Sequence, residues 1–143
     1  MIMFKKITEE NFEECVGLNV AEDQQTFVAP NVRSLAEAWL YPDDVYPFAI
    51  YADDDMVGFV MMGNDEGRYF ICRFMIDAKY QNRGYGKSAL KLTIDYMVQT
   101  LGVKEIYLSF EPENQKAYNL YQSAGFAETG ELIEGETVMK LVV

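Results

Sequence analysis

The strongest constraint on the fold is a change in apolar period at Gly86. Short apolar runs separated by turn residues precede it, at 48–51, 57–62 and 69–76. Because Asp53–Asp55 and Gly63–Gly67 join these runs, they predict an antiparallel meander of three strands. After Gly86, apolar residues recur at helical spacing, at Leu90, Ile94, Met97 and Leu101. The third strand is therefore expected to lead through a glycine-containing turn into a long helix that stops near Gly102.

The remaining elements follow from capping signals and periodicity. They are an edge strand at Ile2–Ile7, a helix from Thr8 to Leu18, a loop at Asn19–Val32, a helix at Ser34–Tyr41, a strand at Glu105–Phe110, a helix at Asn114–Ser123 and a strand at Val138–Val143 in a last hairpin. Thr8 is a suitable N-cap, and Ser34 and Glu37 match a capping box. No linker interrupts this order, so we expect one domain over residues 1–143. The fold class is α/β of the α+β type, with helices flanking one mixed sheet.

The composition limits where the protein is expected to act and which catalytic groups it can use. Half of the 143 residues are hydrophobic, yet no apolar run approaches the ~20 residues that span a bilayer. The start, Met1–Lys6, lacks the layout of a signal peptide, so a cytoplasmic protein without a membrane partner is expected. The absence of histidine excludes Ser–His and Cys–His pairs, and two cysteines cannot form a four-cysteine zinc site. Cys15 and Cys72 read as small buried residues rather than nucleophiles, and no metal is expected.

The charge of the chain is strongly negative and unevenly distributed. With 12 basic and 23 acidic residues the net charge is −11, which disfavours nucleic acid and favours a cationic partner. Acidity that only maintains solubility is the alternative explanation. Residues 79–91 carry Lys79, Arg83, Lys87 and Lys91 and no carboxylate. This segment predicts an anion site, although a solvated helix face would show the same spacing of four residues.

The turn Gln81–Ser88 lies inside this basic segment, between a predicted strand and a predicted helix. Backbone amides converge on such a turn, and the helix dipole adds positive potential, so it is suited to phosphate. Gly84 and Gly86 permit close approach of the main chain to an anion. The turn matches neither the dinucleotide fingerprint nor the Walker loop, which argues against NAD and ATP. Glycines that only turn the chain remain the structural alternative.

Two motifs resemble the GNAT superfamily of acetyl-CoA-dependent N-acetyltransferases. Gln81-x-x-Gly84-x-Gly86 matches the signature at the start of its central helix. Asn114 followed by a helix with Tyr118 and Tyr121, and then by Gly125-Phe126, matches the second signature. The segments 47–51, 56–60, 73–77 and 106–114 are similar to bacterial spermine/spermidine acetyltransferases. The resemblance implies a GNAT-like, mostly antiparallel sheet that splays between its fourth and fifth strands.

The resemblance also implies acetyl-CoA as co-substrate and roles for particular residues. The pyrophosphate would bind the backbone amides of Gln81, Arg83, Gly84, Gly86 and Lys87. The pantetheine arm would pair with the main chain of Phe74, Met75 and Ile76, where an amide would polarise the acetyl carbonyl. Asn114 would hydrogen-bond the arm, and Tyr121 would contact the cofactor and protonate the departing sulfur. The alternative for Tyr118 and Tyr121 is that both only fill the core.

The acceptor implied by the resemblance is a small amine, with spermidine or spermine favoured, that attacks the thioester directly. Related enzymes carry a carboxylate at the position of Cys72, so the proton acceptor is left open, with Glu111 as a substitute. We expect acceptor recognition in the stretches 19–32 and 41–46. The candidate substrate-binding carboxylates are Glu22, Asp23, Asp43, Asp44 and Glu111.

The residues leave other functions open. One is a GNAT enzyme for another acceptor, such as a protein N-terminus, a lysine or a different small amine. Another is an acyl-CoA-binding module without catalysis. GNAT proteins often form homodimers, so the resemblance makes a homodimer possible here.

Overall fold

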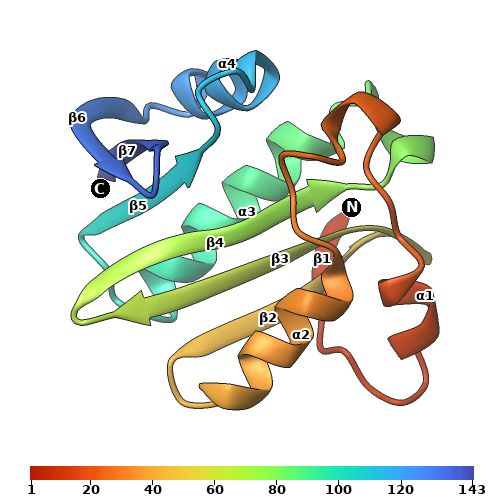
Figure 1. Cartoon of the computed structure of the whole chain (residues 1–143). Coiled ribbons are helices and arrows are strands. Elements are labelled where there is room, and N and C mark those ends of the chain that lie inside the picture. The colour runs from red at the N-terminus through yellow and green to blue at the C-terminus, as the bar shows by residue number, and fades with distance from the viewer.

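The computed structural model describes residues 1–143, which form one seven-stranded mixed sheet (Figure 1). The strand order is β1-β2-β3-β4-β5-β7-β6. The strands are β1 Ile2–Lys5, β2 Val45–Ala52, β3 Asp55–Asp65, β4 Arg68–Ile76, β5 Glu105–Phe110, β6 Ala127–Ile133 and β7 Glu136–Val142. The predicted meander is β2, β3 and β4, whose neighbours pair antiparallel. This confirms the predicted mixed α/β architecture.

The sheet opens between β4 and β5. These two strands are parallel and pair at one position, where Phe70 lies opposite Tyr107. On its other side, β4 pairs with β3 from Arg68 to Ile76. The gap therefore widens toward the carboxyl ends of β4 and β5, at Ile76 and Phe110. This is the predicted splay between the fourth and fifth strands.

Helices cover both faces of the sheet. They are α1 Phe12–Val16, α2 Asn31–Leu40, α3 Tyr85–Gln99 and α4 Gln115–Ser123, with short 3-10 helices at Glu22–Gln24 and Ala78–Tyr80. Figure 1 shows α1 and α2 on the face opposite α3, and α4 beside β5. None of the helices is long and apolar enough to span a bilayer.

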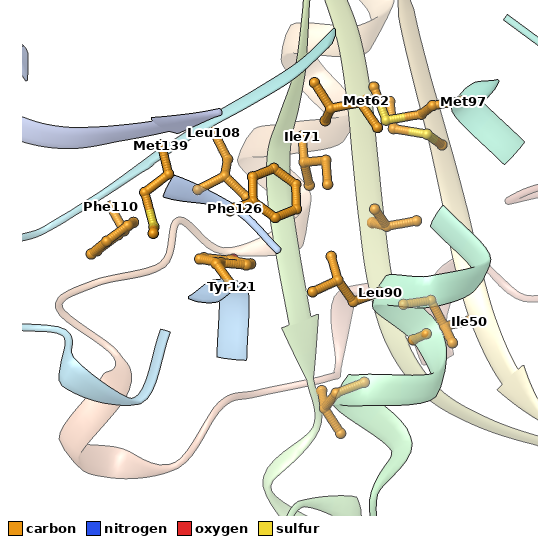
Figure 2. Close-up of a cluster of buried hydrophobic side chains, with 14 of the residues drawn as sticks. Ile50, Met62, Ile71, Leu90, Met97, Leu108, Phe110, Tyr121, Phe126 and Met139 are labelled. Atoms are coloured by element: carbon orange, nitrogen blue, oxygen red, sulfur yellow. The ribbon is translucent and has the colours of Figure 1, made fainter. Parts of the chain in front are cut away.

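Two apolar clusters hold these layers together. The larger one joins α3 and α4 to the sheet and contains Leu90, Tyr121 and Leu108, among other residues (Figure 2). The second lies under α1 and contains Cys15 and Phe59. Between the clusters, β3 is buried continuously from Met56 to Gly63, as expected for a strand covered on both faces.

Two helix starts differ from the prediction. The first helix begins after Asn11 rather than Thr8, because the Asn11 Oδ1 atom accepts the Thr8 amide and closes a turn before the helix. The second helix begins after Pro30, so Ser34 lies inside the helix and its buried Oγ has no hydrogen-bond partner. Glu37 pairs with Arg73 instead of capping a helix start. The predicted capping box is therefore wrong, because the helix begins at Asn31 and Ser34 is not at its start.

The last hairpin contains a strand without an apolar signal. β6 is exposed over nearly all of its length and forms an edge of the sheet. Its register with β7 shifts between Glu128 and Leu132, which marks an irregularity that bends the strand. A strand exposed on both faces needs no alternation of apolar and polar residues, so periodicity did not reveal it.

Candidate active site

The main cavity of the molecule lies at the splay between β4 and β5 and has a volume of about 690 Å³. Its lining comes from distant parts of the chain: the stretch before α2, β4, the turn before α3, β5, α4 and the β6–β7 hairpin. The stretch before α2 contributes Val20, Gln24, Thr26, Phe27, Val28 and Ala29. This agrees with the expectation that residues 19–32 lie over the site. The other expected stretch, 41–46, contributes nothing to the lining.

The turn before α3 presents a series of free amides. The backbone N–H groups of residues 81–87 donate no hydrogen bond within the protein, and the first amide of α3 that does so is that of Ser88, to the Gly84 carbonyl oxygen. Asn82 and Gly84 have positive φ angles of 64° and 84°, which reverses the chain ahead of the helix. Free amides at the N-terminus of a 15-residue helix form a cradle for an anion. The residues present therefore fit a phosphate group.

The two glycines of the turn serve different purposes. Gly84 needs its left-handed φ, which a side chain would strain. Gly86 lines the cavity, and a Cβ there would lie 3.8 Å from Ile76 Cγ1 and 4.0 Å from Leu120 Cδ2. A larger residue at Gly86 would therefore narrow the cavity rather than strain the backbone.

The basic residues Arg83, Lys87 and Lys91, before and along the start of α3, divide into two parts. Arg83 and Lys87 are exposed beside the free amides and form no salt bridge. Lys91, one turn further along, pairs with Asp95 at 3.1 Å. The attraction for an anion thus comes from the first turn of the helix, and Lys91 is part of an ordinary solvated face.

The Gln81 side chain connects three parts of the site. Its Nε2 atom donates to the Ile76 carbonyl oxygen at 2.9 Å and to Gln24 Oε1 at 3.0 Å. Its Oε1 atom accepts from Lys116 Nζ at 3.0 Å. One side chain thereby links the end of β4, the stretch before α2 and α4.

The free edge of β4 offers main-chain groups to the cavity. The Asp77 amide donates to the Val57 carbonyl oxygen at 2.8 Å, so the main-chain groups of Asp77 point toward β3. Because such groups alternate in direction along an antiparallel strand, those of Met75 also point to β3, and those of Phe74 and Ile76 point toward β5. The side chains of Phe74 and Ile76 line the cavity, whereas Met75 packs in the cluster under α1.

Helix α4 places Asn114 and Tyr121 on the cavity wall. Asn114 is the N-cap of α4, and its Oδ1 accepts the Ala117 amide at 3.1 Å. Tyr121 is 9% exposed and packs against Phe110 and Phe126 (Figure 2). Burial raises the pKa of the Tyr121 phenol to about 12, so this side chain stays protonated at neutral pH. Tyr118 packs on Phe110 and does not line the cavity.

The position of the missing carboxylate is occupied by a neutral thiol. Cys72 lines the cavity, and burial raises its pKa to about 11. The adjacent Arg73 also lines the cavity, and its guanidinium contacts both carboxylate oxygens of Glu37, at 3.0 and 3.2 Å. Glu37 is therefore committed to an ion pair, and neither Cys72 nor Glu37 is free to accept a proton.

The five candidate substrate-binding carboxylates separate in space. Glu111 lines the cavity. Glu22 and Asp23 are exposed on the first 3-10 helix, and Asp43 and Asp44 are exposed between α2 and β2. None of these four lines the cavity. No group of three or more Cys, Asp and Glu side chains lies close enough to hold a metal ion.

Sequence reasoning missed the part of the wall formed by the β6–β7 hairpin. Ile133, Glu134 and Glu136 line the cavity, and Ser109 on β5 donates to Glu136 Oε1 at 2.8 Å. The acidic run from Glu128 to Glu136 was visible in the sequence. Its position beside β5 depends on long-range strand pairing, for which one sequence gives no signal.

The chain is similar to a known family and to named relatives. The Acetyltransferase (GNAT) family matches residues 4–126. A spermine/spermidine N(1)-acetyltransferase of Bacillus subtilis strain 168 is 34% identical, over 96% of each chain. A spermidine N(1)-acetyltransferase of Escherichia coli K12 is 32% identical over 78% of this chain and 60% of the relative.

Solved structures show the same fold. The spermidine N-acetyltransferase of Vibrio cholerae, in complex with CoA and spermine, superimposes with a TM-score of 0.79 at 19% identity, covering 99% of this chain and 95% of the other. The PaiA N-acetyltransferase of Thermoplasma acidophilum, in complex with coenzyme A, gives a TM-score of 0.72 at 17% identity, covering 100% and 99%.

Proposed function

The chain belongs to the GNAT family of acetyl-CoA-dependent N-acetyltransferases, and from this premise we propose that its acceptor is a primary amine of spermidine or spermine. The proposal rests on one observation: a single cavity connects the free amides before α3 with Tyr121 and with a wall of carboxylates. An anionic cofactor suits one end of this cavity, and a cationic acceptor suits the other. The Bacillus subtilis relative, whose name includes both polyamines, supports the same acceptor.

The proposed cofactor site uses the elements in order along the cavity. The amides of Gln81, Arg83, Gly84, Gly86 and Lys87 would hold the pyrophosphate, since none of them is engaged within the protein. Beyond the turn, the main-chain groups of Phe74 and the amide of Ile76 would pair with the pantetheine arm as an added strand does, while the Ile76 carbonyl oxygen is occupied by Gln81. Asn114 would add a hydrogen bond, because only its Oδ1 is used in capping α4.

The proposed reaction is direct transfer. Acetyl-CoA supplies a thioester whose carbonyl carbon accepts the nitrogen of a neutral amine. An amide at the edge of β4 would stabilise the negative charge that develops on the carbonyl oxygen. The Tyr121 phenol would donate its proton toward the departing sulfur. Because burial raises the pKa of this phenol to about 12, Tyr121 is in its donor form near neutral pH, although it is a weaker acid than an exposed tyrosine.

The acceptor side carries negative charge that a polyamine would neutralise. Glu111, Glu134 and Glu136 line the cavity and take part in no salt bridge. The two basic residues of the lining are engaged, Arg73 with Glu37 and Lys116 with Gln81. The acceptor end is therefore acidic, which suits an amine with several ammonium groups.

An acceptor screen tests the proposal. The purified protein is mixed with acetyl-CoA and with spermidine, spermine, putrescine, a lysine peptide or a peptide with a free N-terminus, and release of free thiol is followed. We expect the highest kcat/KM values with spermidine and spermine. Activity confined to peptide amines would contradict the polyamine acceptor and leave the acetyl-CoA site unaffected. The mass of the protein in the same sample, measured by analytical ultracentrifugation, tests whether it forms a homodimer.

A further inference from the structure

We propose that Glu136, held by Ser109, is the carboxylate that takes the proton from the attacking amine. The inference rests on the proposed function, because it assigns the step that the neutral Cys72 leaves unfilled. The Ser109 hydroxyl donates to Glu136 Oε1 at 2.8 Å, and Oε2 has no partner within the protein. The carboxylate is therefore oriented by β5 and still has one free oxygen for a ligand.

The strand register explains this arrangement. Phe110 lies opposite Thr137, and Ser109 lies opposite Val138, which is two residues from Glu136 on β7. Residues directly opposite share a face of the sheet, and residues two apart along a strand share it as well. Ser109 and Glu136 therefore lie on one face of the sheet at the end of the splay, as their hydrogen bond requires.

Tyr121 approaches from the other face of β5. It packs against Phe110 and belongs to the cluster that contains Leu108 and Met139 (Figure 2). Alternation along β5 sets Phe110 and Leu108 on the face opposite Ser109. Both Tyr121 and Glu136 line the cavity. A proton donor for the leaving sulfur and a proton acceptor for the incoming nitrogen thus flank the cavity from opposite faces.

The other titratable and charged groups facing the cavity are less suited to this role. They are Cys72 and Arg73 on β4, Glu111 directly after β5, Lys116 and Tyr121 on α4, and Glu134 on the hairpin. Burial raises the pKa values of Cys72 and Tyr121 to about 11 and about 12, so both stay protonated. Glu134 is exposed on the turn. Glu111 has no hydrogen-bond partner that fixes its carboxylate, whereas Glu136 has Ser109.

The proposed acetyl transfer accounts for each bond and each proton. The lone pair of the amine nitrogen forms the C–N bond to the acetyl carbon, and an N–H proton passes to Glu136, directly or through one water. The C–S bond breaks, the sulfur takes the phenol proton of Tyr121, and Tyr121 recovers a proton from solvent. Glu136 then returns its proton to solvent, so the carboxylate is restored for the next cycle.

Substitution of Glu136 by Gln is the direct test, measured with wild type under saturating acetyl-CoA. We expect kcat of E136Q to fall by about 100-fold or more, the contribution usual for a positioned base. The Kd for acetyl-CoA should stay unchanged by calorimetry. The ratio of the wild-type kcat to the E136Q kcat should fall as the pH approaches ~10, the pKa of an alkylamine. At that pH more of the amine is neutral when it binds and has no ammonium proton to lose before it attacks.

Two further variants separate a base from a structural residue. E128Q removes the same charge from the same hairpin at an exposed position outside the cavity and should behave as wild type. S109A keeps the Glu136 carboxylate but removes the hydrogen bond that orients it. We expect kcat to fall about 3- to 10-fold, the scale of one hydrogen bond. E111Q should reduce activity less than E136Q does.

The proposal is overturned if E136Q keeps kcat within about threefold of wild type, or if E111Q is the more damaging change. It is also overturned if E136Q loses acetyl-CoA affinity as strongly as it loses turnover. A wild-type protein that acetylates another amine but not spermidine refutes only the polyamine acceptor, and the variants are then compared with that amine. A wild-type protein that acetylates none refutes both.

Discussion

The two ends of the cavity are built differently. The end that we propose for the cofactor offers main-chain groups set by local signals, the free amides of residues 81–87 and the edge of β4, together with the N-cap side chain of Asn114. The end that we propose for the acceptor is lined by side chains from segments far apart, such as Gln24, Arg73 and Glu136. A main-chain site tolerates side-chain changes as long as its glycines remain. A side-chain site can change its substrate with few substitutions, so the acceptor end is where relatives are expected to differ.

The largest effect is expected from Gly84→Glu. The substitution puts a carboxylate among the amides that would hold the pyrophosphate, and acetyl-CoA should bind about 10³-fold more weakly or worse. Gly102→Glu is the matched control, because Gly102 also has a positive φ, 68°, and follows the other end of the same helix. Both variants should lose about 1–2 kcal/mol of stability, since both strain a left-handed residue. Equal acetyl-CoA affinities by calorimetry would move the phosphate site elsewhere.

Tyr121→Phe should have the next largest effect. Removal of the hydroxyl should lower kcat by about 10²- to 10³-fold and leave the Kd for acetyl-CoA unchanged, because the proton is needed only as the sulfur departs. Since burial raises the phenol pKa to about 12, ionisation of Tyr121 should cause no loss of rate between pH 7 and 10. Tyr118→Phe, outside the cavity lining, is the control. Equal turnover in the Tyr121→Phe and wild-type proteins would remove Tyr121 from the reaction.

Glu37→Gln should affect the acceptor end alone. It leaves the Arg73 guanidinium without its neutralising carboxylate at the cavity wall. The KM for a cationic amine should rise by about 3- to 10-fold, with the KM for acetyl-CoA unchanged. Arg33→Gln removes only an exposed contact of 3.4 Å to the same carboxylate and should change the KM by less than about twofold. Parallel changes in the KM values of both substrates would erase the distinction between the two ends.

The smallest effect is expected from Cys72→Ala. With its pKa raised to about 11 by burial, the thiol is neutral below that value and supplies neither a nucleophile nor a base near neutral pH. We expect kcat/KM within about threefold of wild type and no acetyl group on the protein by mass spectrometry after incubation with acetyl-CoA. An acetylated Cys72 with a matching loss of turnover in the variant would replace direct transfer by a covalent route.

The two ends of the cavity also differ in how well the sequence predicts them, because one depends on local signals and the other on contacts between distant segments. The meander, the long helix and the turn at 81–88 follow from apolar period and from glycines, which are local properties, and all three are present. Ser34 and Glu37 matched a local pattern too, but a tertiary ion pair takes Glu37 and burial takes Ser34. Local signals predict an element reliably where no distant residue competes for the same side chain.

The position of Glu136 is an example of a feature that one sequence does not predict. Its place beside Ser109 needs β7 to pair with β5 and the hairpin to return over the end of the splay. Charge in the sequence suggests the four carboxylates at 22, 23, 43 and 44 as substrate-binding residues. Charge alone does not show which carboxylates face the cavity in the folded chain. The charge favours a cationic partner but names no contact residues, whereas the fold identifies which acidic residues line the cavity.

The most direct measurement of the whole account is a crystal structure of the protein with CoA and spermine. The account predicts the pyrophosphate against the amides of residues 81–87, the thiol beside Tyr121 between β4 and β5, and an amine of spermine next to Glu136. Nucleotide density in another part of the molecule, with the turn before α3 contacting only solvent, would contradict it.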